Sequence, residues 1–103
     1  MPTTRAAVAL LGAQIAAARK ERGWTAADLA ERVGVQPHTI GRLERGEPTV
    51  AIGLAFEAAV IVGVPLFAAN ERELPALAAA ARQRLLLLPA RVTKPVVVVD
   101  DNF

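Results

Sequence analysis

A chain of 103 residues has room for one small domain and an arm, and its formal net charge is only +2. It contains no run of eighteen apolar residues and no basic-then-apolar start, so we expect neither a transmembrane span nor a signal peptide. The absence of cysteine excludes disulfides and thiol chemistry. A composition that is 53% apolar, rich in alanine, valine and leucine, favours tightly packed helices. We expect a cytoplasmic protein.

The first helix is predicted over residues 5 to about 22, with residues 1–4 frayed. Apolar residues recur at helical spacing at Val8, Leu11, Ile15 and Ala18. The basic run of residues 19–22 ends this helix ahead of Gly23. Trp24 follows at a position where we expect an apolar side chain that packs into the core.

Residues 24–46 predict two short helices joined by a tight turn. Thr25 can cap the first of them with its hydroxyl, and Asp28 at the third helical position suits the helix dipole. Gly34 can adopt the left-handed conformation that ends a helix. Pro37 is acceptable in the first turn of the second helix, because its missing N–H would have no partner there.

The second of these helices has two different edges. Ile40 and Leu43 are three residues apart and face the core. The other edge is polar and carries Gln36, His38, Thr39, Arg42 and Arg45. Arginine can bind guanine in a bidentate manner, and threonine or histidine can add single contacts, so this edge predicts reading of the DNA major groove.

Specific contacts follow from this interpretation. The base-contacting residues are predicted to be Gln36, His38, Thr39 and Arg42, with phosphate as an alternative target of Thr39. Backbone N–H groups at Thr25 and Ala26 and the side chain of Arg45 are predicted to contact phosphates.

An enzyme is not expected. His38 is the single histidine and has no paired carboxylate at catalytic spacing, although a buried position in the core remains open for it. The sequence contains no metal-ligand cluster and no glycine-rich phosphate loop, so we expect no metal and no cofactor.

The pattern resembles the Xre/Cro-type helix-turn-helix of phage repressors over roughly residues 8–66. The matching residues are Arg19, Gly23, Thr25, Leu29, Ala30, Gly34, Val35, Thr39, Ile40, Arg42, Glu44 and Gly46. The resemblance implies an all-α, five-helix, lambda-repressor-like DNA-binding domain in residues 1–70. It also implies that Arg19 pairs with Glu44, tying the first helix to the third, and that Gln36 occupies the first contact position. Pro37 departs from the polar residue usual at its position, so one potential base contact is missing.

Two further helices are predicted after Gly46. Thr49 is the expected cap of a helix that ends at Gly63, and Gly53 inside it either marks a close approach to a neighbour or is neutral. The segment Leu66-Phe67 resembles the start of the fifth helix in this family.

Residues 71–103 are predicted to form a dimerisation helix and a partner-binding tail. Pro75 suits the first turn of a helix running to about Leu88. The run of residues 85–88 is apolar all round, so one face would be exposed in a monomer. We therefore expect a homodimer whose twin helices read an inverted-repeat operator.

The tail from residue 92 differs from the rest of the chain. Its valines favour a strand, for which another chain would have to supply the partner strand. The predicted partner-binding residues are Val96, Val97, Val98, Val99, Asp100, Asp101 and Phe103. This ending resembles HipB-like antitoxins, Xre-type repressors that pair with HipA-like kinase toxins and repress their own operon. The alternatives are a solubilising tail, and a stand-alone regulator or protein-interaction module without a toxin.

Overall fold

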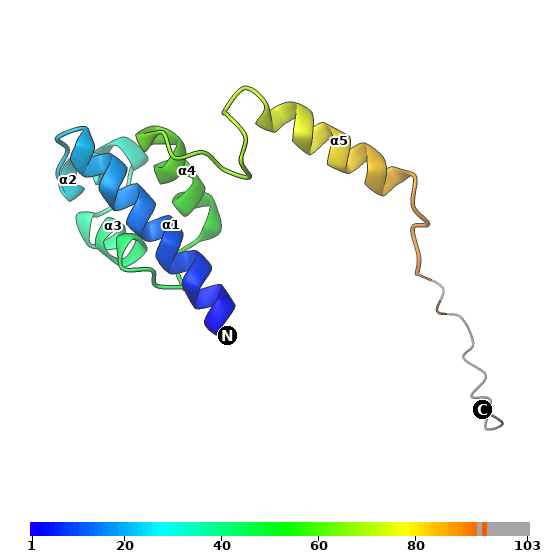
Figure 1. Ribbon diagram of the computed structural model, residues 1–103, viewed down its shortest axis with the longest axis horizontal. Helices are drawn as coiled ribbons and strands as arrows, with labels where there is room; N and C mark the ends of the chain where they lie inside the picture. Colours follow the sequence, from blue (N-terminus) through cyan, green and yellow to red (C-terminus); the bar gives the residue numbers. More distant parts are fainter. Residues whose placement is uncertain (93, 95–103) are drawn as a thin grey trace. The chain divides into compact units, whose positions relative to one another are not determined.

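The computed structural model describes residues 1–92 and 94, and this part of the chain forms five α-helices and no strand (Figure 1). The helices are α1 (Pro2–Glu21), α2 (Ala26–Val33), α3 (Pro37–Glu44), α4 (Ile52–Val62) and α5 (Leu74–Leu86). The all-α prediction with five helices is confirmed for the described residues, but the fifth helix lies at Leu74–Leu86, after the domain of residues 1–70 in which it was expected. The partner-binding residues predicted between 96 and 103 lie outside the described residues. The chain divides into two units, Met1–Glu71 and Arg72–Phe103, and each is described by itself.

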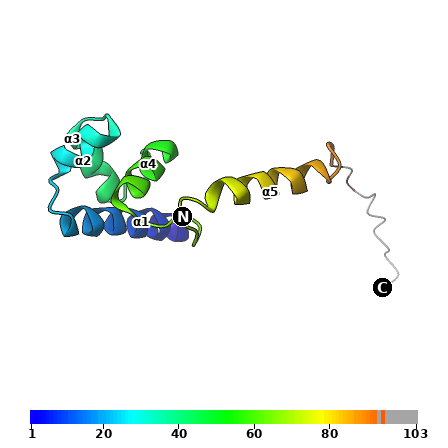
Figure 2. The same ribbon diagram turned by 90° about the horizontal axis from the view of Figure 1, so that it is seen from above.

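The first unit is a small helical domain with one apolar core. In Figure 2, α2, α3 and α4 lie on the same side of α1. Helices α1 and α2 each pack against both α3 and α4, and α2 with α3 forms the helix-turn-helix. The largest fully buried side chains are Ile15, Leu29, Ile40 and Leu43, one or more from each of α1, α2 and α3. Helix α4 contributes Ala58 and Ala59, whose small side chains let the helices approach closely.

Helix α1 begins earlier than predicted, so the expectation that residues 1–4 are frayed is wrong. Met1 is its N-cap and Pro2 its first residue. Proline is favourable there, because the first N–H groups of a helix have no partner in the helix and the φ angle of proline is already helical. The N–H of Arg5 donates to the Met1 carbonyl at 3.0 Å, which closes the first turn.

The predicted cap of α2 is confirmed, and it is reciprocal. The Thr25 hydroxyl accepts the Asp28 N–H at 3.0 Å, and Asp28 Oδ2 accepts the Thr25 N–H at 2.8 Å. This capping box satisfies two N–H groups at the start of the helix. The same hydrogen bonds lower the pKa of Asp28, so the cap stays ionised and intact near neutral pH.

Helices α1 to α4 all end in the same way, at a glycine with a positive φ angle. These glycines are Gly23, Gly34, Gly46 and Gly63. The residue after each glycine donates its N–H to a carbonyl five residues earlier, as in the Schellman motif: Trp24 to Arg19, Val35 to Ala30, Glu47 to Arg42 and Val64 to Ala59. The residue after the glycine is apolar in three helices, but it is the carboxylate Glu47 after α3.

Helix α1 lies very close to the end of α3. A Cβ added at Gly12 would meet the carbonyl oxygens of Leu43 and Glu44, the latter at 2.9 Å, and one added at Gly46 would meet the Ala9 Cα at 2.8 Å. At Gly53, by contrast, an added Cβ meets nothing within 4 Å, so the close approach considered for that residue is not present.

The prediction that Thr49 caps α4 is wrong. The N-cap is Ala51, and the Thr49 hydroxyl instead accepts a hydrogen bond from Arg42 at 2.7 Å. The hydroxyl is therefore used to connect the loop to α3, and α4 begins without a side-chain cap.

The prediction that Leu66-Phe67 starts a helix is also wrong. Leu66 and Ala69 form an isolated antiparallel bridge, and the two residues between them have positive φ angles of 56° and 54°. Both bridge residues are buried in the core, so tertiary packing overrides the local tendency to form a helix. Helix α5 starts only at Leu74, with Pro75 in its first turn as expected.

In the second unit, α5 has no buried residue. Three of its leucines, Leu77, Leu85 and Leu86, are exposed by 50%, 56% and 83%. An isolated helix of this length is marginal in water.

Candidate nucleic-acid interface

A buried ion pair fixes α3 against α1. Arg19 Nε donates to Glu44 Oε2 at 2.7 Å, Nη2 donates to Oε1 at 2.8 Å, and Nη1 donates to the Trp24 carbonyl at 2.8 Å. The hydrogen bonds with Glu44 raise the pKa of Arg19, and only 8% of this residue is exposed. A bidentate pair in such a place fixes orientation as well as adding energy, so α3 is held rigidly by its inner side.

The outer side of α3 carries the residues that the sequence predicted to contact DNA, and we call this set the reading edge. It consists of Gln36, His38, Thr39, Arg42 and Arg45. Gln36 is the N-cap of α3, and both it and His38 are exposed, so His38 is not part of the core. Arg45 is also exposed, whereas Thr39 and Arg42 are half-buried. His38 and Arg42 are one helical turn apart and Arg45 is three residues further, so they lie on one side of the helix.

Arg42 is held in place by two residues of the loop after α3. Its Nε donates to Glu47 Oε2 at 2.6 Å, and its Nη2 donates to the Thr49 hydroxyl at 2.7 Å. Arg45 Nη2 lies 3.6 Å from the other carboxylate oxygen of Glu47. The hydrogen bond from Arg42 is the main cause that lowers the pKa of Glu47, so this carboxylate is ionised at neutral pH.

Sequence reasoning missed Glu47 and Thr49, although a signal for Glu47 exists. Gly46 ends α3 in a Schellman motif, in which the Glu47 N–H donates to the Arg42 carbonyl at 3.1 Å. That motif brings the side chains of the two residues into contact. The pattern that predicts this ion pair is therefore a glutamate directly after a helix-ending glycine, with an arginine five positions before the glutamate.

The start of α2 presents the positive end of its helix dipole at Thr25 and Ala26. Thr25 is exposed and Ala26 half-buried. The capping box uses the Thr25 N–H, which is bonded to Asp28. The N–H of Ala26 is therefore the first backbone donor of α2 that a phosphate could approach.

Trp24 differs from the expected core side chain. Its ring is half-buried, and two guanidinium groups lie near it, that of Arg32 at 4.0 Å and that of Arg22 at 5.3 Å from the ring centroid. Arg22 Nε also donates to the Val62 carbonyl at 3.0 Å, which connects the end of α1 to the end of α4. The indole therefore makes cation–π contacts with two arginines instead of packing fully into the core.

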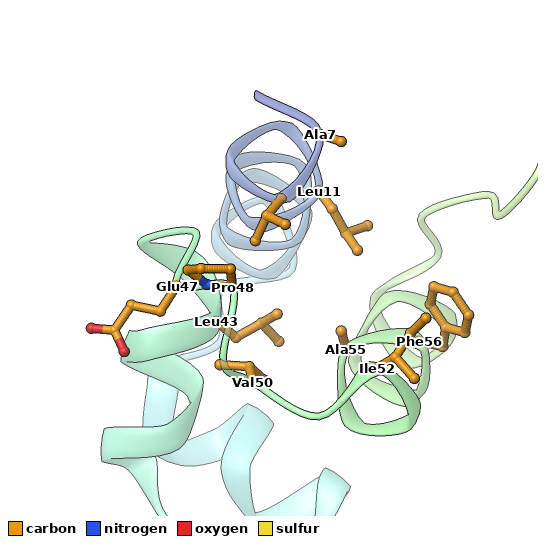
Figure 3. A pocket seen from close by; sticks show the side chains of 10 residues that line it. Ala7, Leu11, Leu43, Glu47, Pro48, Val50, Ile52, Ala55 and Phe56 are labelled. Atoms are coloured by element: carbon orange, nitrogen blue, oxygen red, sulfur yellow. The ribbon is translucent and has the colours of Figure 1, made fainter. Parts of the chain in front are cut away.

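An apolar hollow of about 270 Å³ lies between α1, α4 and the loop that joins α3 to α4 (Figure 3). Its lining includes Leu11, Ile52 and Phe56, and Glu47 is its single charged residue. In Figure 3 the Glu47 carboxylate points away from these apolar side chains, toward the side of α3. The hollow therefore offers no convergent polar groups of the kind that a catalytic pocket needs.

Comparison with known families agrees with this geometry. The profile of a helix-turn-helix domain family matches residues 10–82, which is most of the chain. The chain belongs to this helix-turn-helix family, whose members are DNA-binding regulators of the Xre type. No curated protein and no solved structure gives a match. Among the helices of the described residues, none is both long and apolar enough to cross a membrane.

Proposed function

We propose that this protein is a sequence-specific transcriptional repressor that inserts α3 into the major groove of duplex DNA. The observation that carries the proposal is the reading edge itself, a polar and partly basic strip on a helix whose inner side is fixed by Arg19 and Glu44. A rigid helix with exposed hydrogen-bonding side chains matches the dimensions and the donor and acceptor pattern of that groove.

Within this proposal the polar residues have separate roles. Gln36, His38, Thr39 and Arg42 contact base edges, while Arg45 and the backbone at Thr25 and Ala26 contact phosphates. Phosphate contacts position the domain and base contacts select the sequence. Arg42 would exchange its present partner Glu47 for a guanine when the domain docks.

Substitutions at the two arginines of the reading edge should have different effects. We expect Arg42→Ala to cost about 1–3 kcal/mol on the operator and to relax the preference at one base pair. Arg45→Ala should weaken binding to all sequences alike and flatten its salt dependence. Fluorescence anisotropy with the duplex upstream of the gene, and with single-base variants of it, measures both. Equal loss on every sequence for Arg42→Ala would contradict its assignment as a base-contacting residue.

We also propose that the protein binds its operator as a homodimer joined through α5. This helix exposes Leu77 near its start and Leu85 and Leu86 at its end and buries none of its residues, and a second copy would provide the matching apolar face. Two copies would place their α3 helices about 34–36 Å apart and read an inverted repeat.

The dimer predicts a specific change in sedimentation. Leu77→Glu combined with Leu85→Glu should convert the dimer to a monomer, because paired carboxylates cannot be buried in an apolar interface. Gln83→Glu, which adds a charge to the same helix, is the control and should leave the dimer intact. Analytical ultracentrifugation distinguishes the two masses. A wild-type monomer at micromolar concentration would overturn this proposal.

A narrower proposal is that the repressor is a HipB-like antitoxin whose tail binds a HipA-like kinase toxin. The resemblance of the ending, with its valine run and acidic residues before Phe103, supports it. Deleting residues 92–103 should abolish capture of a kinase encoded beside this gene, while DNA binding stays intact. Co-purification and anisotropy measure the two activities. Toxin capture that survives the deletion would locate the interaction elsewhere.

A further inference from the structure

Glu47, directly after the glycine that ends α3, is an acidic residue at a position where an apolar one is expected. In α1, α2 and α4 the residue after the helix-ending glycine is Trp24, Val35 or Val64, and each is half-buried or buried. An apolar residue is usual at this position of the Schellman motif, because its side chain packs back on the helix. After α3 the same position carries Glu47, whose carboxylate turns to the reading edge rather than to the apolar hollow.

The contacts of Glu47 are made to two residues of the reading edge. It accepts from Arg42 Nε at 2.6 Å and lies 3.6 Å from Arg45 Nη2. With the Thr49 hydroxyl on Nη2, two of the three nitrogens of the Arg42 guanidinium already have a partner. A carboxylate that binds arginine in this way has the same charge sign as a DNA phosphate oxygen and forms the same kind of charge-assisted hydrogen bond.

We propose that Glu47 competes with DNA phosphates for Arg42 and Arg45 and is thereby a specificity determinant. The two arginines leave Glu47 only when contacts with bases compensate for the loss of the ion pairs. This inference rests on the proposed function. Non-specific binding depends on the number of phosphates that cations neutralise. A protein in which one carboxylate offsets one of the two positive charges of Arg42 and Arg45 binds random duplex more weakly, which raises the ratio of specific to non-specific affinity.

The test is Glu47→Gln, which keeps the size of the side chain and removes its charge. The probe is a duplex of mixed sequence that does not contain the region upstream of the gene. We expect binding about five- to tenfold tighter near 0.1 M salt, and a plot of log affinity against log salt that is steeper by about one unit.

Glu57→Gln is the matched control. Glu57 is exposed on α4 and its loss changes the net charge by the same amount, so it reports the general effect of charge. We expect less than a twofold change for it. In the Arg42→Ala background the gain from Glu47→Gln should shrink, because the main partner of Glu47 has been removed. Thermal unfolding of each variant shows that the domain remains folded.

The outcomes separate this inference from the proposed function. If the wild-type protein binds the duplex but Glu47→Gln binds no more tightly than Glu57→Gln, the competitor role is overturned and the DNA-binding proposal stands. Weaker binding by Glu47→Gln would also overturn it, because Glu47 would then be positioning Arg42 for contact. If neither protein binds any duplex, both proposals fall together.

Discussion

Glu44→Ala is expected to destabilise the domain by about 3 kcal/mol, because it leaves the Arg19 guanidinium buried without its charge partner. Arg19 is 8% exposed and makes two of its three hydrogen bonds to Glu44. A small domain has a stability of about 5–15 kcal/mol, so this single change removes a large part of it. Thermal unfolding followed by circular dichroism should show a fall in Tm of about 15 °C.

Two further variants show whether the loss comes from the pair itself. Glu57→Ala removes an exposed carboxylate from α4 and should change stability by less than about 0.5 kcal/mol. Arg19→Met combined with Glu44→Leu should be more stable than Glu44→Ala alone, because no charge is then left buried. If Glu44→Ala has the same Tm as the Glu57→Ala control, the ion pair between Arg19 and Glu44 does not hold α3 on α1.

Gly12→Ala is expected to destabilise the domain by about 2–3 kcal/mol, although alanine is the better helix former. The added methyl group would collide with the carbonyl oxygens of Leu43 and Glu44 at the end of α3, and backbone atoms cannot move aside as a side chain can. The helices α1 and α3 must separate, and the ion pair between Arg19 and Glu44 must stretch with them. Urea unfolding measures the change.

Gly53→Ala is the matched control for this effect. It makes the same chemical change inside another helix, but the new methyl group meets nothing within 4 Å. We expect it to raise stability by up to about 1 kcal/mol. Opposite signs for the two glycines would confirm that close packing, rather than helix propensity, decides at Gly12. Equal signs would contradict this account of the contact between α1 and α3.

Much of the fold could be predicted from local chemistry. Thr25 with Asp28 predicts the cap of α2, and Gly34 predicts its end, because each depends on neighbours in the sequence. Pro37 and Pro75 mark the first turns of α3 and α5 for the same reason.

The errors occurred where distant contacts decide. Thr49 is of a residue type that often caps helices, but its hydroxyl accepts a hydrogen bond from Arg42 instead. Leu66-Phe67 is apolar enough for a helix, but Leu66 and Ala69 are anchored in the core and force a turn between them. Gly12 was not singled out in the sequence, and only the three-dimensional packing shows that the close approach of α3 requires a glycine there.

For the candidate interface, the sequence located the exposed edge of α3 from the alternation of buried Ile40 and Leu43 with polar residues. The sequence could not show that Arg42 is hydrogen-bonded to Glu47 and Thr49 in the free protein. That depends on the path of the loop after Gly46, which turns Glu47 back along the helix.

The most direct test of the account is protection of guanine N7 atoms from dimethyl sulfate on the duplex upstream of the gene, since N7 is reached only through the major groove. We predict two protected sets about one helical turn apart, with Arg42→Ala losing one guanine from each set. Strong binding without N7 protection, or a protection pattern that Arg42→Ala leaves unchanged, would contradict the claim that α3 reads the major groove.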